Sequence, residues 1–408
     1  MQPIVTHRTY EFVPPYHGYL WPWLLKYLIP GYLRNQYGVT DVEFRGAEKL
    51  RDVFDSGQGV LLAPNHSRMA DALVMQLLSR HLGRHFFIMA SSHLFYTGKR
   101  RAWVIRRAGA FSVYREGVDR EAVKAAIDIL AQARRPLVLF PEGSLSHSND
   151  RLNALMAGVS MIARSAARRR ARTDGAAGKI VVVPVAIKYL FKGELRREIE
   201  PMLEEIEARL SWRPQRELGI LERIYKAGGS LLTLKEMEFF GAPRPGTLPE
   251  RLEGLIDHLL GPLEETWLQG RQDGSVITRV KELRKAVLPE MIEGDLPEDE
   301  GRRRWRHLED MYLAQQLSLY PSNYIASKPT VDRMLETTDK FQENLTGREQ
   351  PHAPTTAVVE IGEPISVDQK ARRDEGGDPL LLAIEGQLGD LLAALADESQ
   401  LYEDGDGG

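Results

Sequence analysis

Residues 59–72 read GVLLAPNHSRMADA, and the interpretation of the whole chain starts from this stretch. The apolar run 59–63 is typical of a buried strand, and a proline and an asparagine end it. From Asp71 onward, apolar residues recur at helical spacing. His66 is therefore predicted to lie where a strand ends and a helix begins, which is where open α/β sheets bind ligands.

His66 and Asp71 can meet only if the histidine stays in the turn and the aspartate enters the first helical turn. On one continuous helix, five positions would turn the two side chains apart, because one turn takes about 3.6 residues. Ser67 is placed to cap this helix. An imidazole oriented by a carboxylate can act as a general base at neutral pH. No Gly-x-Ser-x-Gly nucleophile motif precedes the pair, so the base is expected to act directly on a substrate hydroxyl. A chance match to this spacing remains the alternative.

Composition limits the class of protein. The chain has 408 residues, of which 43% are hydrophobic and 27% charged, and its formal net charge is −3. These values are typical of a globular protein of two or three domains, or of one elaborated domain, and give no nucleic-acid signature. The absence of cysteine excludes disulfides, thiolate metal sites and a cysteine nucleophile. We expect no secretory signal, because the first residues, MQPIVTHRTYEFVPP, lack a basic segment followed by an apolar core. We also expect no membrane span, because no stretch reaches ~18 apolar residues.

Residues 1–45 are predicted to form an interfacial helical segment. Within it, GYLWPWLLKYLIPGYLR (residues 18–34) combines five Trp and Tyr side chains with two cations and two prolines. Trp and Tyr favour the membrane–water interface, and cations meet anionic headgroups. We expect this segment to contact a membrane surface. The alternative is a helix packed on the body of the domain.

Residues 46–192 alternate strand-like and helical patterns, which predicts an α/β core with a central, mostly parallel or mixed sheet flanked by helices. Pro184 is expected to mark a sheet edge, a bulge or a strand end, because proline cannot donate to a ladder. Residues 193–350 are helical and polar, and a strand-like run returns within 351–370, so a large helical insertion is predicted. Residues 371–408 are predicted to form an amphipathic helix and a disordered acidic tail.

Two further stretches carry candidate site residues at predicted strand ends. The run GAFSVYR ends in Arg115, and the run PLVLF leads directly into Glu142, Gly143 and Ser144. Gly143 allows the backbone to approach a ligand closely. Glu142 is expected beside His66 at the carboxyl end of the sheet. The alternatives are a surface salt bridge for Arg115, and a buried arginine partner or a helix cap for Glu142.

Four blocks in this order, NHSRMAD, GAFSVYR, FPEGSLS and VVVPVAI, resemble the glycerolipid acyltransferases of the lysophosphatidate acyltransferase type. VEFRGAEKL and VVEIGEPI look like the flanking strands of that family. The resemblance covers roughly residues 40–192 and 355–367 and leaves out the helical insertion. It implies transfer of a fatty acyl group from a thioester, on CoA or acyl carrier protein, to a glycerolipid hydroxyl, with no bound cofactor and no metal.

The resemblance also implies roles for single residues. By position, His66 is the general base and Asp71 its orienting partner. Arg115 binds the phosphate of the acceptor, and the residues of the PEGS turn shape the acceptor pocket. Leu145 replaces an arginine that the family carries in its third block. Arg68 is a cation where the family often has a small polar residue, and we expect it to restore the lost charge if it points into the site.

The sequence thus predicts an acyltransferase for a lysophosphatidate-like lipid, with the membrane surface and no nucleic acid as partner. It is expected in the cytoplasm, peripherally attached to the inner face of the cell membrane. One alternative is a different lysolipid or a non-phosphorylated lipid as acceptor, which Leu145 favours. Another is an inactive membrane-associated scaffold of the same fold, against which the intact His66 and Asp71 pair argues. A thioesterase-like hydrolase that uses water is the third.

Overall fold

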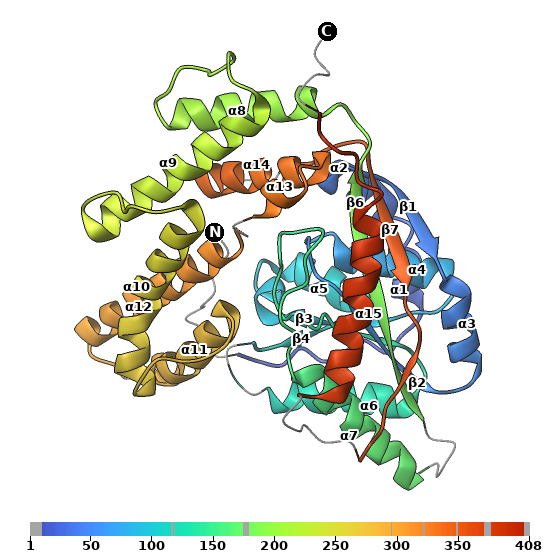
Figure 1. Cartoon of the computed structure of the whole chain (residues 1–408). Helices are drawn as coiled ribbons and strands as arrows, with labels where there is room; N and C mark the ends of the chain where they lie inside the picture. The colour runs from blue at the N-terminus through green and yellow to red at the C-terminus, as the bar shows by residue number, and fades with distance from the viewer. Residues whose placement is uncertain are drawn as a thin grey trace. The chain divides into compact units, whose positions relative to one another are not determined.

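A computed structural model describes residues 10–115, 117, 119–173, 179–294, 296–320, 323–347, 350–370 and 377–403. The chain divides into two compact units, a core unit and a helical unit (Figure 1). The core unit holds residues 10–193 and 350–399, and the helical unit holds residues 194–349 and the chain from residue 400. The sequence predicted a helical insertion over 193–350.

The core unit is built on one eight-stranded sheet. Its strands are β1 (Val39–Arg45), β2 (Gly59–Pro64), β3 (Phe87–Ser91), β4 (Ala110–Val113), β5 (Leu137–Val138), β6 (Ile180–Phe191), β7 (Thr355–Ile361) and β8 (Ile365–Ser366). The spatial order is β1-β7-β6-β2-β5-β3-β4, and β8 also pairs with β6. Strands β2 to β6 run parallel to one another, whereas β7 and β8 run antiparallel to β6, and β1 runs parallel to β7. The predicted α/β fold with a mixed, mostly parallel sheet is confirmed.

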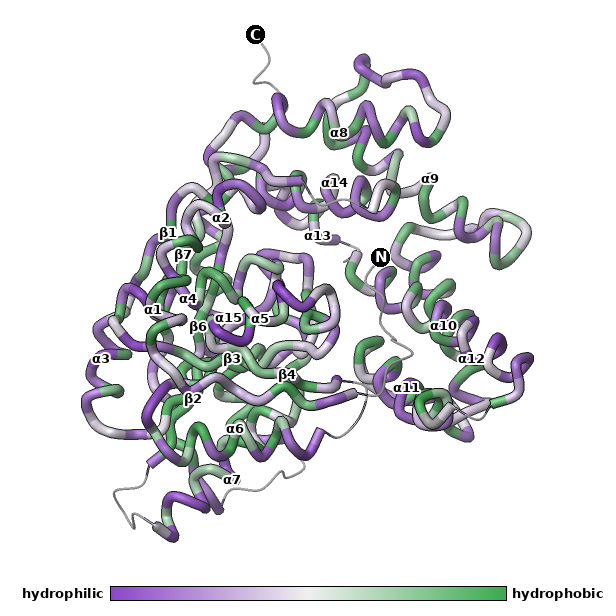
Figure 2. The backbone as a smooth tube through the Cα atoms, turned by 180° about the vertical axis from the view of Figure 1, so that it is seen from behind, coloured by the Kyte–Doolittle hydropathy of each residue, from purple (hydrophilic) through white to green (hydrophobic). Residues whose placement is uncertain are grey.

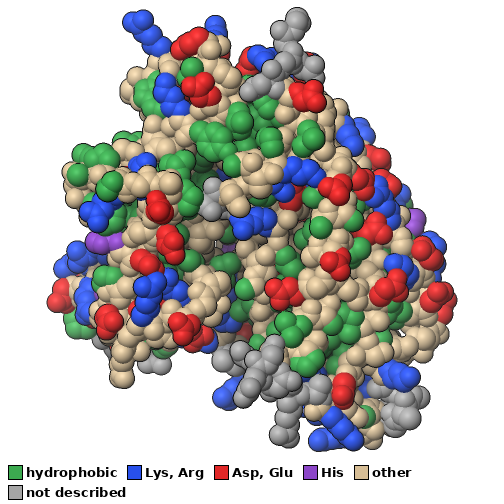
Figure 3. Space-filling view, in the orientation of Figure 1, with side chains coloured by type: hydrophobic (Ala, Val, Ile, Leu, Met, Phe, Trp, Pro, Cys, Tyr) green, Lys and Arg blue, Asp and Glu red, His purple; other side chains and the backbone are tan. Residues whose placement is uncertain are grey.

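Helices cover both faces of this sheet. In the core unit they are α1 (Leu20–Leu25), α2 (Ile29–Tyr37), α3 (Ala47–Asp55), α4 (Asp71–His81), the 3-10 helix η1 (Ser92–Phe95), α5 (Lys99–Arg107), α6 (Arg120–Gln132), α7 (Gly158–Thr173) and α15 (Pro379–Ala396). Successive side chains of a strand point to opposite faces, so Val183 and Val185 of β6 pack with α2, α3 and α4, while Val182 packs with α6, α7 and α15. Figure 2 shows hydrophobic residues gathered in the sheet, and Figure 3 shows cationic and anionic side chains interspersed on the surface.

Pro184 lies inside the central strand β6, so the predicted sheet edge or strand end is wrong. On one side, β6 pairs with β2 through Ala63 and Pro184. On the other side, the antiparallel partner changes from β7, which ends at Ile361, to β8, which begins at Ile365. The carbonyl of Pro184 accepts from the N–H of Gly362 at 2.9 Å, inside this break. The N–H that proline lacks therefore faces a gap between two partner strands.

Two segments outside the predicted core boundaries belong to the sheet or its cover. β1 lies within the predicted segment 1–45 but pairs with β7. Among the described residues, α15 is long and apolar enough to cross a membrane by length and composition, so the expectation that no stretch reaches this length is wrong. Its residues Leu388 and Leu392 are buried in cores beneath the sheet, as in a packed helix of a globular domain. The end of the predicted acidic tail, residues 404–408, lies outside the described residues.

The helical unit contains α8 (Leu195–Arg209), α9 (Ile220–Phe240), α10 (Leu248–Leu268), α11 (Val276–Glu293), α12 (Glu298–Ser318), α13 (Tyr324–Ser327) and α14 (Val331–Thr346). Helices α9 to α12 share a hydrophobic core of leucine, valine and methionine side chains. Two bidentate ion pairs are buried between neighbouring helices: Arg223 with Glu207 at 2.8 Å and Arg279 with Glu264 at 2.7 Å. Removing one partner of such a pair leaves an uncompensated buried charge, so these pairs fix how the helices pack.

Candidate active site

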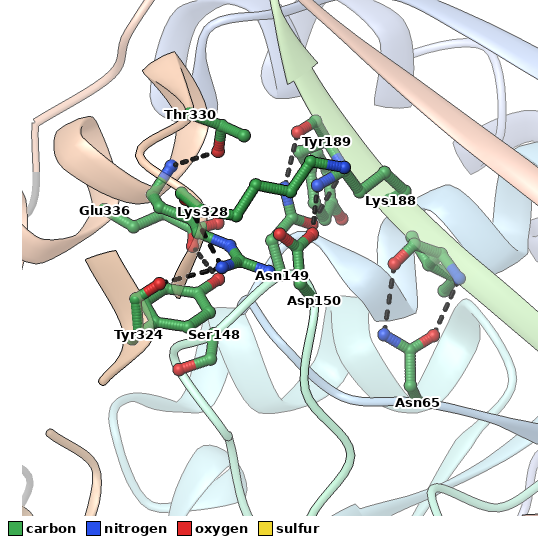
Figure 4. A network of polar contacts seen from close by, with 12 residues as sticks. Asn65, Ser148, Asn149, Asp150, Lys188, Tyr189, Tyr324, Lys328, Thr330 and Glu336 are labelled. Atoms are coloured by element: carbon green, nitrogen blue, oxygen red, sulfur yellow. Dashed lines mark hydrogen bonds and ion pairs between the residues drawn. The ribbon is translucent and has the colours of Figure 1, made fainter. Parts of the chain in front are cut away.

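The candidate site begins where the chain leaves the sheet at the end of β2. The backbone N–H of Asn65 donates to Val185 O at 3.3 Å. Its side-chain amide donates to Ile187 O at 3.0 Å and accepts from Ile187 N at 2.7 Å, as Figure 4 shows. The amide thus continues the ladder to β6 after the regular strand has ended. These hydrogen bonds fix the backbone just before the next residue, His66.

The structure brings His66 and Asp71 together. His66 Nδ1 lies 2.9 Å from Asp71 Oδ2, and the aspartate side chain is fully buried while that of the histidine is 19% exposed. The N–H of Arg68 donates to the same oxygen at 2.9 Å. The predicted capping role of Ser67 is wrong, because α4 begins after Ala70, which makes no side-chain cap hydrogen bond. The loop is closed by the carboxylate of Asp71 instead.

Tyr189 is a third donor to Asp71 that the sequence did not reveal. Its hydroxyl donates to Asp71 Oδ1 at 2.6 Å, and the residue is fully buried. Burial, together with the negative charge of Asp71, raises the pKa of Tyr189 well above its usual value, so the hydroxyl keeps its proton and remains a donor. The sequence signal was limited to strand alternation, which puts Tyr189 on the α4 face of β6.

The backbone of Tyr189 is held by the loop that follows β5. Asn149 accepts from Tyr189 N at 2.9 Å and donates to Tyr189 O at 2.5 Å. The next loop residue, Asp150, forms an ion pair with Lys188 in which both side chains are almost completely buried. In Figure 4 both contacts lie along one stretch of β6. The loop therefore positions Tyr189 in the same way that Asn65 positions His66.

The carboxylate of Glu142 binds backbone N–H groups on both of its oxygens and leaves neither oxygen open to a substrate. Its Oε1 accepts from His66 N at 2.6 Å, and its Oε2 accepts from Asn153 N at 2.9 Å. The residue is fully buried, and burial raises its pKa to about 8 although these two amides lower it. Glu142 lies beside His66, as the sequence predicted. Because both oxygens bind backbone amides, its contribution is to hold the loop around His66.

Arg115 and the PEGS turn also meet. Arg115 Nη1 donates to the carbonyl of Gly143 at 2.8 Å. Gly143 has a φ of +69°, which favours glycine, and an added Cβ would lie 2.2 Å from the sulfur of Met156. The hydroxyl of Ser144 is buried and has no hydrogen-bond partner. The guanidinium of Arg115 and the unpaired hydroxyl of Ser144 therefore both lie at the turn after β5, beside His66.

Arg68 lies on the other side of His66. Its guanidinium is 4.7 Å from the ring centre of Tyr189, which belongs to β6. Arg115 follows β4, but its guanidinium contacts Gly143 in the turn after β5. In the sheet, β6 and β5 lie on either side of β2, the strand that leads into His66. The two cations therefore flank the histidine from opposite directions.

The arrangement can abstract a proton from a hydroxyl group. With Nδ1–H donated to the carboxylate, Nε2 of His66 is left to accept a proton. Phe140 stacks on the imidazole with ring centres 4.0 Å apart, which adds an apolar wall that the sequence did not single out. In the part of the chain that the structure describes, no group of three or more His, Asp and Glu side chains could hold a metal ion.

Comparison with known proteins covers the same region. Residues 41–188 match a family model described as Acyltransferase. The chain is 36% identical over 107 residues to a protein of Streptococcus pneumoniae (strain ATCC BAA-255 / R6) named 1-acyl-sn-glycerol-3-phosphate acyltransferase. That alignment covers 26% of this chain and 37% of the length of the relative, so most of both proteins lies outside it.

Glu142 gives a pH-dependent prediction. A carboxyl whose pKa is raised from 4.5 to about 8 on folding makes the folded state progressively less stable as pH rises through that interval. In Glu142→Gln this penalty is absent. We therefore expect the unfolding free energy of the variant to rise relative to wild type between pH 4.5 and pH 8, measured by urea denaturation.

The matched control is Glu363→Gln, because the side chain of Glu363 is 72% exposed. Its difference from wild type should stay nearly constant over the same pH interval. A constant difference for Glu142→Gln as well would contradict the account of Glu142 as a buried, destabilised carboxylate.

Proposed function

We propose that His66 is the general base of an O-acyltransferase with a lysophosphatidate-like acceptor, because residues 41–188 match the acyltransferase family model, as the four sequence blocks predicted. The observation that carries the proposal is the hydrogen bond between His66 Nδ1 and the fully buried Asp71. It leaves Nε2 as the acceptor for the proton of a substrate hydroxyl.

The proposed reaction needs no covalent intermediate. The acceptor hydroxyl gives its proton to Nε2 of His66 while its oxygen attacks the thioester carbonyl of acyl-CoA or acyl carrier protein. The C–S bond then breaks, an ester is formed, and the thiolate takes up the proton from His66. Asp71 stabilises the charged imidazole between the two proton transfers. The hydrogen bond from Tyr189 keeps Asp71 in the orientation that this step requires.

The acceptor assignment rests on Arg115. A guanidinium suits phosphate geometry because its planar fork can form two parallel hydrogen bonds. The Streptococcus pneumoniae relative is named as a 1-acyl-sn-glycerol-3-phosphate acyltransferase, which supports a phosphate-bearing acceptor, but that match is partial. Leu145, in the position of a family arginine, favours a neutral or zwitterionic lysolipid as the second candidate.

We further propose that the core unit binds the membrane surface through α1 and α2. Leu33 of α2 is buried in the core, whereas an opposite set of large side chains is exposed: Tyr19, Leu20, Trp23, Leu24, Tyr27, Leu28 and Tyr32. Trp21 packs edge-on against Trp103 of the cationic helix α5, with ring centres 4.7 Å apart, so α5 extends this surface. Aromatic, leucine and cationic side chains together fit an anionic lipid surface. This supports a peripheral position on the inner face of the cell membrane.

The catalytic proposal is tested by three variants. His66→Ala should lower kcat by ~10²–10⁴-fold, because the general base is lost. Asp71→Asn should lower kcat strongly with little change in the KM of the acceptor. Tyr189→Phe should lower kcat by roughly tenfold, since one of three donors to Asp71 is removed. The assay follows labelled acyl-CoA with lysophosphatidate. Tyr225→Phe, on α9, is the control, and near-wild-type turnover of His66→Ala would rule out the mechanism.

Membrane binding is tested on residues that the structure leaves exposed. The double variant Trp23→Ser/Leu28→Ser should shift the protein to the supernatant when it is sedimented with liposomes of anionic phospholipid. Trp21 is not a suitable target, because it packs against Trp103. Leu382→Ser on α15 removes a leucine that is 51% exposed on another helix and serves as the control. Equal sedimentation of all three proteins would favour a packed-helix role for α1 and α2.

The acceptor proposal is tested by comparing the two arginines. Arg115→Ala should raise the KM for lysophosphatidate about tenfold or more, with a much smaller effect on monoacylglycerol, because only the first acceptor carries a phosphate. Arg68→Ala should affect both acceptors alike, since Arg68 lies over Tyr189 on the other side of the base. A selective loss for lysophosphatidate in both variants would instead support compensation by Arg68 for Leu145. No selectivity in either variant would move the acceptor to the neutral class.

A further inference from the structure

His93 and Arg115 follow two neighbouring strands, β3 and β4, that end at the same edge of the sheet. The parallel strands β3 and β4 are paired up to Ser91 and Val113, and His93 and Arg115 each lie two residues beyond this last pair. Parallel neighbours end at the same edge of a sheet and lie about 4.8 Å apart. The edge is the carboxyl end, where β2 also leads into His66. The histidine therefore stands beside the proposed phosphate ligand.

One ring nitrogen of His93 is satisfied and the other is not. Nδ1 lies 2.8 Å from Ser91 Oγ, whereas Nε2 is buried without a hydrogen-bond partner. Burial, with the nearby charges of Arg115 and Arg101, lowers the pKa of His93 to about 4, so the ring is neutral at neutral pH. If the hydroxyl of Ser91 donates to Nδ1, Nε2 carries the proton and is a donor. A buried donor without a partner is costly, which favours a ligand oxygen or water at this point.

A second unsatisfied donor follows β5, the strand on the other side of β3 from β4. The hydroxyl of Ser144 is buried without a hydrogen-bond partner. Ser144 directly follows Gly143, whose carbonyl accepts from Arg115 Nη1 at 2.8 Å. The guanidinium is thus fixed to the backbone next to one unpaired hydroxyl and, through the strand register, next to one unpaired imidazole nitrogen. The three donor groups follow three neighbouring strands, β5, β3 and β4, at the same edge of the sheet.

We propose that His93, together with Ser144, binds the phosphate of the acceptor beside Arg115 and takes over the role of the family arginine that Leu145 has replaced. The proposal rests on the acyltransferase function proposed above and names His93 as a specificity-determining residue. A phosphate oxygen accepts from Nε2–H of His93, and Ser91 holds the ring in the required tautomer. Arg68 contacts Tyr189 of β6 instead.

Kinetics with two acceptors test this role. His93→Ala should raise the KM for lysophosphatidate about tenfold, from loss of one hydrogen bond to a charged group, with kcat and the KM for monoacylglycerol nearly unchanged. His93→Gln, which keeps a side-chain N–H donor, should recover much of the affinity. The matched control is His85→Ala: His85 precedes β3 at the opposite end of the strand, packs against Tyr19, and has its pKa lowered to about 4 by burial.

The kinetic result that overturns the proposal is a fall in kcat without selective loss of lysophosphatidate, or no change in either acceptor. Calorimetric binding of glycerol 3-phosphate, inorganic phosphate and glycerol to the full chain tests the site without turnover. Wild type should bind glycerol 3-phosphate and inorganic phosphate, and His93→Ala should bind both about tenfold more weakly. Glycerol should bind to neither protein. Phosphate binding that depends on His93 in a protein without acyltransferase activity would uphold the site and reject the proposed function. Equal phosphate binding by wild type and His93→Ala would reject the site.

Discussion

The carboxylate of Asp71 is the point on which the rest of the site depends. It is fully buried, and a buried carboxylate is costly unless donors surround it. Its donors are His66 Nδ1, the N–H of Arg68 and the hydroxyl of Tyr189. These groups come from the turn after β2, from the residues that lead into α4, and from β6. Satisfying one charge therefore fixes the turn after β2, the start of α4 and β6 relative to one another.

Side chains that bind backbone groups give the site its precision. Asn65 and Asn149 each form two hydrogen bonds with the backbone of β6, at Ile187 and Tyr189. Glu142 binds the backbone N–H of His66 from the turn after β5. Each of these contacts replaces regular strand pairing where the strands have ended. His66 is consequently held by elements of the sheet itself, which limits the rearrangement needed when a substrate binds.

Local pattern was enough to predict the fold and the place of His66 at a strand end. The apolar run 59–63, the break at Pro64 and Asn65, and the helical spacing from Asp71 are all adjacent in sequence. The alternation of strands and helices continues from there. Contacts between distant residues were not predictable in this way. Tyr189 reaches Asp71 across 118 positions, and strand alternation alone does not say what its hydroxyl meets. Pro184 was misplaced because its neighbour on one side is a break between β7 and β8, more than 150 residues later in the chain.

The central claim is that Asp71 holds His66 with the proton on Nδ1 and leaves Nε2 free to act as the base. The ¹⁵N chemical shifts of the His66 ring, measured at neutral pH on protein with ¹⁵N-labelled histidine and assigned with His66→Gln, report the tautomer directly. The account predicts a protonated Nδ1 and an unprotonated Nε2 in wild type. A neutral ring protonated on Nε2 would contradict it, because that nitrogen could not then accept the proton of a substrate hydroxyl.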